Sequence, residues 1–242
     1  MDTSLHAGYI LHQRPWRETS LILEVFSRDH GRLGLVARGA RRSTNRQRWL
    51  FQPFRRLNLA WVMRRELGTL THVEAADGHE PPAGAAVMAG FYLNELLLRL
   101  LHRHEPHAEL FDAYAAALEG IRDEAGREPA LRIFEKHLLA SLGYGMVLDR
   151  EADSGRPLDA QRSYYYRADL GPCAAAPEGR SAVTVSGAAL YALRDERLVD
   201  PAHLAQTKRL MRMLLAEHLG GRPLASRDLY RRFVKDPGQR LE

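Results

Sequence analysis

Cysteine is almost missing from this chain, since Cys173 is the only one among 242 residues. A single cysteine excludes an intrachain disulfide and a structural zinc site built from several cysteine ligands. The sequence also lacks an apolar run long enough to cross a bilayer, and its first nine residues lack the apolar core of a signal peptide. These absences predict a protein of a reducing, cytoplasmic compartment that does not enter a membrane.

The motifs of common catalytic sites are absent as well. There is no GxxxxGK[ST] nucleotide loop, no GxSxG or GxGxxG motif and no Asp-x-Asp metal pair. His102, His104 and His107 are close in sequence, but the first two would point to different sides of a helix and Pro106 would interrupt that helix before the third. We therefore predict no catalytic activity, no cofactor and no metal. A metal-dependent nuclease that uses these histidines is the enzymatic alternative.

Positive charge is segregated along the chain. The net charge is +5, and lysine occurs only at positions 136, 208 and 235, so nearly all basic side chains are guanidinium groups. Between His30 and Arg65 there is no Asp or Glu, while ten arginines occur in the same stretch. Guanidinium groups bind phosphates through paired hydrogen bonds, so this stretch predicts a nucleic-acid surface. The residues that we assign to DNA binding are Arg38, Arg41, Arg42, Arg46, Arg48, Arg56, Arg64 and Arg65.

All three tryptophans lie in or near the same part of the chain, at positions 16, 49 and 61. A basic groove with interleaved aromatic rings is typical of sequence-tolerant binding to single strands. Trp61 alternates with Leu57 and Leu59, which predicts a place in the core. For Trp16 and Trp49, base stacking and core packing both remain open.

A second basic cluster lies toward the C-terminal end. It could extend a DNA path, present a face to a partner, or be ordinary solvated helix surface. Its members are Lys208, Arg209, Arg212, Arg227, Arg231 and Arg232.

The first 78 residues contain short runs of β-forming residues separated by turn residues, a pattern that predicts strands. Five short antiparallel strands in so short a segment match a small closed barrel, of which the OB-fold is the five-stranded form. The fold class is thus α+β, with a barrel domain over residues 1–78. The predicted strands are Gly8–Gln13, Ser20–Ser27, Arg32–Arg38, Phe54–Val62 and Thr69–Ala75.

A Gly- and Pro-containing linker follows, and beyond it the apolar period changes from two to 3.6. This predicts a mainly helical domain over residues 79–242, interrupted at about 147–185 by an insert with two strand-like patches. Pro129 is expected to open the third helix and Gly143 to end it, while Ser186 and Ser226 are expected N-caps. The predicted helices are Val87–Leu101, one around Leu110–Ile121, Pro129–Leu142, one after Ser186, Pro201–Leu219 and Ser226–Phe233.

Several segments in the same order resemble bacterial RecO recombination mediators. They are YILHQRPWRETSLIL from Tyr9, VARGARR from Val36, QPF from Gln52, GFYLNELLLRLL from Gly90, EPH from Glu105, LGY from Leu142 and LGGRPLASRDLYR from Leu219. The resemblance covers nearly the whole chain.

The resemblance implies an OB-fold barrel, a helical domain and a small zinc-finger-like insert. It implies a nucleoid-associated protein that binds single- and double-stranded DNA, anneals complementary strands without ATP, contacts the C-terminal tail of the single-stranded DNA-binding protein SSB, pairs with RecR and helps RecA to replace SSB in gap repair. Many members have four zinc-binding cysteines in the insert, whereas residues 149–157 have none here. We therefore expect a degenerate insert, without zinc and held by packing alone.

The SSB tail is acidic and ends in an apolar residue, so its receptor should be an apolar pocket flanked by positive charge. Arg132, Phe134, Lys136 and Leu138 have suitable spacing on the third predicted helix. Two alternatives to a DNA-binding mediator remain open. One is an OB-fold protein that binds RNA, and the other is a non-catalytic scaffold for acidic partner proteins.

Overall fold

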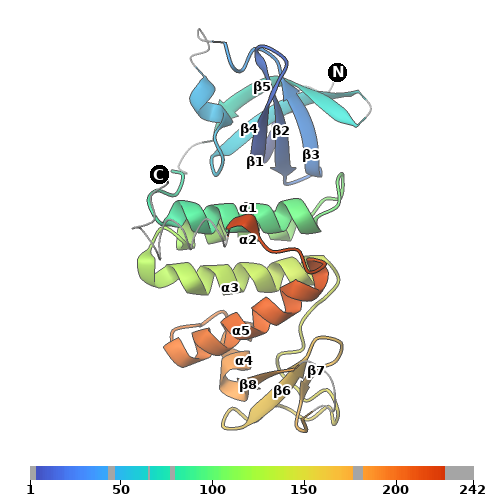
Figure 1. Cartoon of the computed structure of the whole chain (residues 1–242), viewed down its shortest axis with the longest axis vertical. Helices are drawn as coiled ribbons and strands as arrows, with labels where there is room; N and C mark the ends of the chain where they lie inside the picture. Colours follow the sequence, from blue (N-terminus) through green and yellow to red (C-terminus); the bar gives the residue numbers. More distant parts are fainter. Residues whose placement is uncertain (1–3, 43–46, 65, 77–79, 177–181, 227–242) are drawn as a thin grey trace, which may run out of the picture. The chain divides into compact units, whose positions relative to one another are not determined.

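The computed structural model describes residues 4–42, 47–64, 66–76, 80–176 and 182–226, apart from the side chain of Arg64. The chain forms two compact units (Figure 1). The first unit contains residues 1–119 together with the segment from Leu224 onward, and the second contains residues 120–223. The first unit thus extends beyond the predicted barrel domain of residues 1–78, and that domain boundary stays a prediction.

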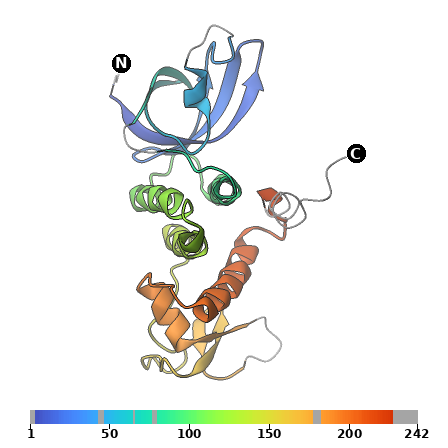
Figure 2. The same cartoon turned by 90° about the vertical axis from the view of Figure 1, so that its left-hand side faces the viewer.

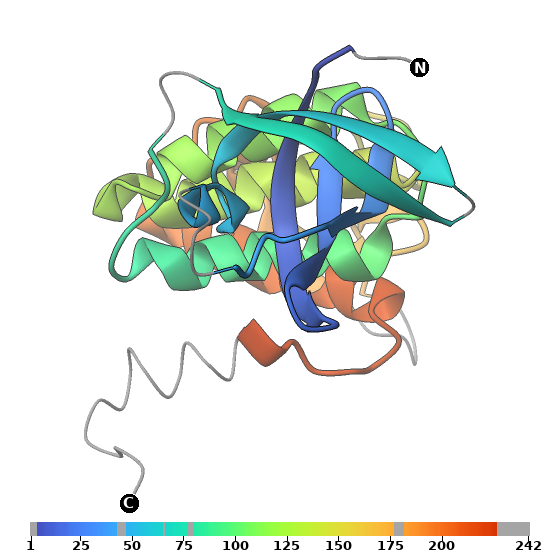
Figure 3. The same cartoon turned by 90° about the horizontal axis from the view of Figure 1, so that it is seen from above.

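The first unit opens with a closed five-stranded barrel of strand order β1-β2-β3-β5-β4. β3 and β5 pair in parallel, and the other described neighbours pair antiparallel. This is the OB-fold topology, so the predicted fold class is confirmed. Figure 3 shows the barrel strands from above. They are β1 (His6–Trp16), β2 (Ser20–Ser27), β3 (Gly31–Ala37), β4 (Arg56–Arg64) and β5 (Leu67–Ala75), with a short 3₁₀ helix η1 (Arg48–Phe51) between β3 and β4.

Alternate residues of the strands fill the barrel. Leu57 and Leu59 of β4 are completely buried, and Trp61 packs against the same core, as the alternation predicts. Leu50 and Phe51 of η1 also belong to this core, so they anchor the long β3–β4 connection to the barrel.

Two helices, α1 (Ala86–Leu100) and α2 (Ala108–Gly120), pack on the outside of the barrel. Figure 2 shows both nearly end on, side by side next to the strands. The ring of Phe26 lies 5.5 Å from that of Phe111, and the ring of Tyr9 lies 5.0 Å from that of Tyr114. Strand β2 is almost entirely buried because its inner face fills the barrel while Phe26 packs against α2.

A buried polar chain fixes α1 between β1 and α2. The Asn94 side chain, only 2% exposed, donates to the Leu11 carbonyl at 2.8 Å. It accepts from the Tyr114 hydroxyl at 2.5 Å. Burial raises the pKa of Tyr114 well above its ordinary value, so this hydroxyl keeps the proton that it donates.

Replacing Asn94 with alanine is expected to lower the free energy of unfolding by about 2–3 kcal/mol, because a buried carbonyl and a buried hydroxyl each lose their hydrogen bond to Asn94. Urea unfolding followed by tryptophan fluorescence measures this, since all three tryptophans belong to the first unit. Asn58→Ala is the control. Asn58 is only half-buried and bonds Glu74 on the outer surface of the barrel, so its loss is expected to cost about 0.5 kcal/mol or less. Equal losses for the two variants would contradict the role of Asn94.

The β2–β3 turn meets the loop between α1 and α2. The His104 amide donates to the Arg32 carbonyl at 2.9 Å, and the Arg32 side chain donates to the Leu98 carbonyl at 2.8 Å. Glu24 pairs with Arg103. Gly31 stands at the start of β3 with φ +65°, and a Cβ there would lie 1.9 Å from the Glu105 carbonyl oxygen. Only glycine fits this contact.

The end of the described chain returns to α1. The Glu95 carboxylate accepts from the amides of Ala225 and Ser226 at 2.9 Å each, and from the Ser226 hydroxyl at 2.6 Å. Residues 225 and 226 are already helical. The prediction that Ser226 is the N-cap is therefore wrong, because a carboxylate distant in sequence accepts the amide hydrogens instead. The remainder of the predicted helix to Phe233 lies outside the described residues.

The second unit begins with α3 (Glu124–Ser141). The prediction that this helix opens at Pro129 is wrong, since Pro129 lies inside it. The helix starts earlier because the Asp123 side chain accepts from the Gly126 amide at 2.8 Å and acts as N-cap. Gly143, with φ +84°, follows the helix end as predicted.

The remaining elements of this unit are β6 (Ser163–Arg167), β7 (Gly171–Cys173), β8 (Val183–Ser186), α4 (Gly187–Arg194) and α5 (Pro201–His218). The strands form a small sheet of order β7-β6-β8, in which β7 is the strand that the sequence did not indicate. The predicted N-cap at Ser186 is confirmed, because its hydroxyl accepts from the Ala189 amide at 3.2 Å.

The predicted insert, residues 147–185, is held by hydrogen bonds as well as by packing. The Glu151 amide donates to the Arg156 carbonyl at 2.8 Å, and the Ser154 hydroxyl donates to the Glu151 carboxylate at 2.6 Å. The expectation of packing alone is therefore wrong, because side chains and backbone of this turn bond to one another. None of the helices in the described ranges is long and apolar enough to cross a membrane.

Candidate nucleic-acid interface

A groove of about 660 Å³ opens at one end of the barrel. The end of β1, the β1–β2 turn, the end of β3 and the start of the β3–β4 connection surround it, and β5 contributes one residue. The lining residues are Trp16, Arg17, Glu18, Thr19, Ser20, Val36, Arg38, Gly39, Arg42 and Thr69. In OB-folds the β1–β2 loop and the face of β2 and β3 bind oligonucleotides, so the groove lies where this fold places such ligands.

Arg41 ties the two loops of the groove together. Its amide donates to the Thr19 carbonyl at 2.8 Å, and its side chain reaches the carbonyls of Arg17 and Glu18 at 3.4 Å each. Gly39, with φ +68°, allows the turn that brings Arg41 there. Arg41, which we assigned to DNA contact, therefore positions the β1–β2 turn.

Arg38, Arg42 and Arg48 are exposed, and within the described ranges no carboxylate contacts them. Their guanidinium groups are therefore available for hydrogen bonds to a phosphate. We call these three residues the arginine triad. They lie on the β3–β4 connection, which carries no acidic residue.

At the opposite end of the barrel, Arg28 and Arg32 are bound by other groups of the protein. Arg28 donates two hydrogen bonds to Asp112 at 3.0 and 3.2 Å, and Arg32 lies half-buried against α1. Burial lowers the pKa of the Arg32 guanidinium, an effect that Glu24 opposes. The eight residues of β2 separate the two ends by about 23 Å at the usual rise per residue. Positive charge available to a ligand is thus concentrated at the groove end.

Among the described arginines that we assigned to DNA binding, Arg38 and Arg42 line the groove, whereas Arg41, Arg48 and Arg56 do not. The Arg56 guanidinium lies 6.0 Å from the ring centre of Phe111, on the side of the barrel that faces α2. Arg46 and Arg65 lie outside the described residues, as does the side chain of Arg64.

The three tryptophans have different surroundings. Trp16 is 40% exposed and lines the groove. Trp49 is 47% exposed on η1, with the Arg55 guanidinium 4.7 Å from its ring centre. Trp61 packs against the barrel core, and its ring lies near those of His6 and His30, at 5.0 and 5.2 Å. Trp61 is half-buried and packs against the core without being enclosed in it, so its predicted core position is confirmed in part.

The second basic cluster is only partly described. Lys208 on α5 pairs with Glu128 at 2.8 Å, whereas Arg209 and Arg212 on the same helix are exposed. Arg227, Arg231 and Arg232 lie outside the described residues.

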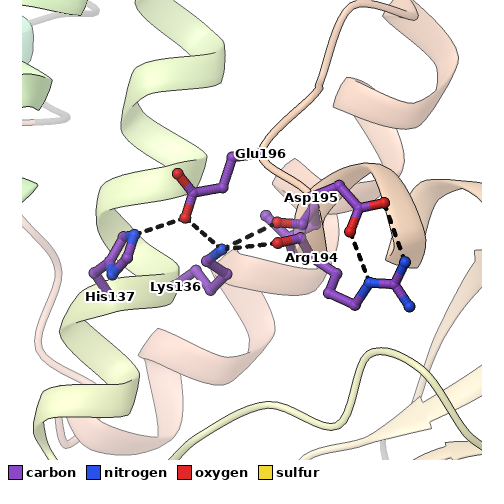
Figure 4. A network of polar contacts seen from close by, with 6 residues as sticks. Lys136, His137, Arg194, Asp195 and Glu196 are labelled. Carbon is purple, nitrogen blue, oxygen red and sulfur yellow. Dashed lines mark hydrogen bonds and ion pairs between the residues drawn. The ribbon is translucent and has the colours of Figure 1, made fainter.

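The four residues proposed for the SSB tail do not form an open apolar pocket. Phe134 and Leu138 are completely buried, and the buried Arg132 bonds Glu135 at 2.7 Å. Figure 4 shows Lys136 and His137 of α3 directed at the Glu196 carboxylate, at 2.6 and 2.7 Å. Lys136 also donates to the Leu193 and Arg194 carbonyls at the end of α4. A tail could bind these residues only after the core had opened.

The sequence interpretation missed Arg17, Thr19 and Thr69 as groove residues. Arg17 precedes an acidic residue and lies outside the acid-free stretch, so charge segregation could not identify it. The signal that could have found it is the turn between the first two strands of an OB-fold. Among the described residues, no three His, Cys, Asp or Glu side chains lie close enough to hold a metal ion.

Comparisons with known proteins agree with this architecture. Residues 1–79 match the family model "Recombination protein O N terminal", and residues 82–228 match "Recombination protein O C terminal". DNA repair protein RecO of Nitrosococcus oceani is 45% identical over 229 residues, 95% of this chain and 93% of that protein. The proteins of the same name from Methylococcus capsulatus and Alkalilimnicola ehrlichii are 46% and 47% identical, over 94% and 95% of this chain and 93% and 92% of theirs. The chain therefore belongs to the RecO family.

Proposed function

We propose that this protein is a DNA-binding recombination mediator whose barrel groove holds the phosphate backbone. The observation that carries the proposal is the arginine triad, three exposed guanidinium groups that contact no carboxylate within the described residues. Phosphate contacts from such groups supply most of the sequence-independent affinity for DNA.

Annealing follows from the same electrostatics. Two complementary strands repel each other through their phosphates, and a protein that neutralises both lowers this repulsion so that bases can pair. No bond is made or broken, so the step needs no nucleotide hydrolysis. Family membership supports a place in DNA repair and recombination, in which the protein helps RecA to replace SSB on single-stranded gaps. SSB, through its C-terminal tail, and RecR are the proposed partners.

The test is annealing of complementary DNA strands coated with SSB, with and without this protein and in the absence of ATP. We expect the protein to accelerate duplex formation, read as energy transfer between dyes on the two strands. SSB without its C-terminal tail is the matched control, and with it the acceleration should fall. If SSB-coated strands anneal at the same rate with and without the protein, it is not an annealing mediator.

Binding measurements separate the alternatives. An RNA-binding OB-fold protein would bind matched RNA strands more tightly than DNA strands in direct competition. A scaffold would bind DNA weakly and acidic partner peptides tightly. The arginine triad favours the nucleic-acid classes over the scaffold, because exposed arginines on an acid-free loop suit a dense row of phosphates.

A further inference from the structure

We propose that Trp16 stacks on an unpaired base and thereby makes the groove select single-stranded over duplex DNA. The inference rests on the proposed function, and it adds which part of the ligand Trp16 contacts. Trp16 is then a specificity-determining residue of the groove.

The first observation is where the exposed indole lies. Trp16 is 40% exposed and lines the same groove as Arg38 and Arg42. A lone exposed tryptophan needs no special explanation, but an exposed ring between basic side chains is the arrangement by which proteins bind single strands. The ring offers a stacking surface, and the arginines offer contacts for the phosphates.

The second observation is that the backbone at Trp16 is held in place. Trp16 is the last residue of β1 and pairs with Ser20 of β2. The turn between them contains Arg17 in the left-handed region, at φ 52°, and Arg41 holds the carbonyls of Arg17 and Glu18. A side chain whose backbone is already held in place loses less freedom when a base stacks on it.

The third observation is the distribution of charge around the ring. Arg17 and Glu18 line the groove on the β1–β2 turn, and their opposite charges offset each other. Arg38 and Arg42 line it on the β3–β4 connection, where no acidic residue opposes them. A phosphate is therefore attracted mainly by the β3–β4 connection, so the backbone should follow Arg38 and Arg42 while the base turns toward Trp16. In a duplex the bases are paired and stacked inside, and one would have to flip out to reach the ring. Trp16 therefore contributes only to single strands.

The experiment compares Trp16→Ala and Trp16→Phe with the unchanged protein. Binding of a mixed-sequence single strand and of its duplex is measured by fluorescence anisotropy at one salt concentration. In Trp16→Ala the ratio of single-strand to duplex affinity should fall about 5- to 140-fold, the worth of one stacked base. Trp16→Phe keeps a ring and should retain most of the ratio. A thermal melt of each variant checks that the barrel is intact.

Trp49→Ala is the matched control, since Trp49 is an equally exposed tryptophan of the barrel that does not line the groove. The proposal is overturned if Trp16→Ala leaves the ratio unchanged, if it weakens both ligands equally, or if Trp49→Ala has the larger effect. A different result would overturn the proposed function. If Arg38→Gln with Arg42→Gln leaves both affinities unchanged, the groove does not bind DNA, whatever Trp16 does.

Discussion

Replacing all three residues of the arginine triad, Arg38, Arg42 and Arg48, with glutamine is expected to weaken duplex DNA binding by about 150- to 2,000-fold at low salt. Each lost phosphate contact should cost about 1–1.5 kcal/mol. Each also releases fewer counterions, so the slope of log affinity against log salt should flatten by about 0.9 per contact, or about 2.7 for three. Titrations at several salt concentrations measure both quantities.

The matched control removes the same charge elsewhere. Arg150, Arg156 and Arg197 are exposed arginines of the second unit, and their replacement with glutamine leaves the groove as it is. We expect their salt slope to stay close to that of the unchanged protein. A slope that drops equally in both triple variants would assign the effect to net charge, and an unchanged slope in the arginine-triad variant would remove these three arginines from DNA binding.

The choice of residues depends on the structure. From the sequence alone, Arg41 is as good a candidate as its neighbours, since all belong to one acid-free stretch. In the structure its side chain holds the β1–β2 turn, so a defect in Arg41→Gln would combine lost loop geometry with lost charge. Arg38, Arg42 and Arg48 avoid this ambiguity.

Gly31→Ala is expected to destabilise the first unit by about 4 kcal/mol or more. A Cβ would lie 1.9 Å from the Glu105 carbonyl oxygen and 2.5 Å from its carbon, so one of the two backbone segments must move. The φ of +65° adds strain for any residue with a side chain. Displacement would also break the bond from the His104 amide to the Arg32 carbonyl. Urea unfolding followed by tryptophan fluorescence measures the loss.

Gly84→Ala is the control that separates the cost of the left-handed backbone from the cost of the steric clash with Glu105. Gly84 has nearly the same φ, +58°, but nothing lies within 4 Å of the position of its Cβ. Its substitution should cost only about 1–2 kcal/mol, the price of the left-handed conformation alone. If both glycine variants lose the same amount, the contact between the β2–β3 turn and Glu105 does not stabilise the unit.

The barrel could be predicted because its signal is local. Alternation at Leu57, Leu59 and Trp61, with turn residues between short strands, is visible in any window of ten residues. The helix boundary at Pro129 could not be predicted with the same rule. Proline is common in an opening turn, but here the Asp123 side chain caps the helix earlier and the helix continues through Pro129, which has no amide hydrogen to donate. The sequence offers both Asp123 and Pro129 as the start of this helix, and it does not show which of the two starts it.

The sequence predicted which loop carries the positive charge of the candidate site, but it did not predict which basic side chains pair with carboxylates. Segregation of arginine from acid identified the loop that carries Arg38 and Arg42. Contacts between segments distant in sequence were not visible, such as Lys136 with Glu196 or Arg28 with Asp112. These pairings decide which basic side chains remain available to a ligand, and they form only once the chain has folded.

The hydrogen bonds that Glu95 accepts can form only after its partners have been synthesised. Its partners Ala225 and Ser226 follow it by 130 and 131 positions, and a ribosome adds about 5–20 residues per second. Roughly 6–26 s therefore pass between the synthesis of Glu95 and the synthesis of these two amides. Throughout that interval the carboxylate has Arg99, 3.6 Å away on the same helix, as its neighbour. A nascent chain can thus build the barrel early, while the returning segment can attach to α1 only after 130 further residues have been added to Glu95.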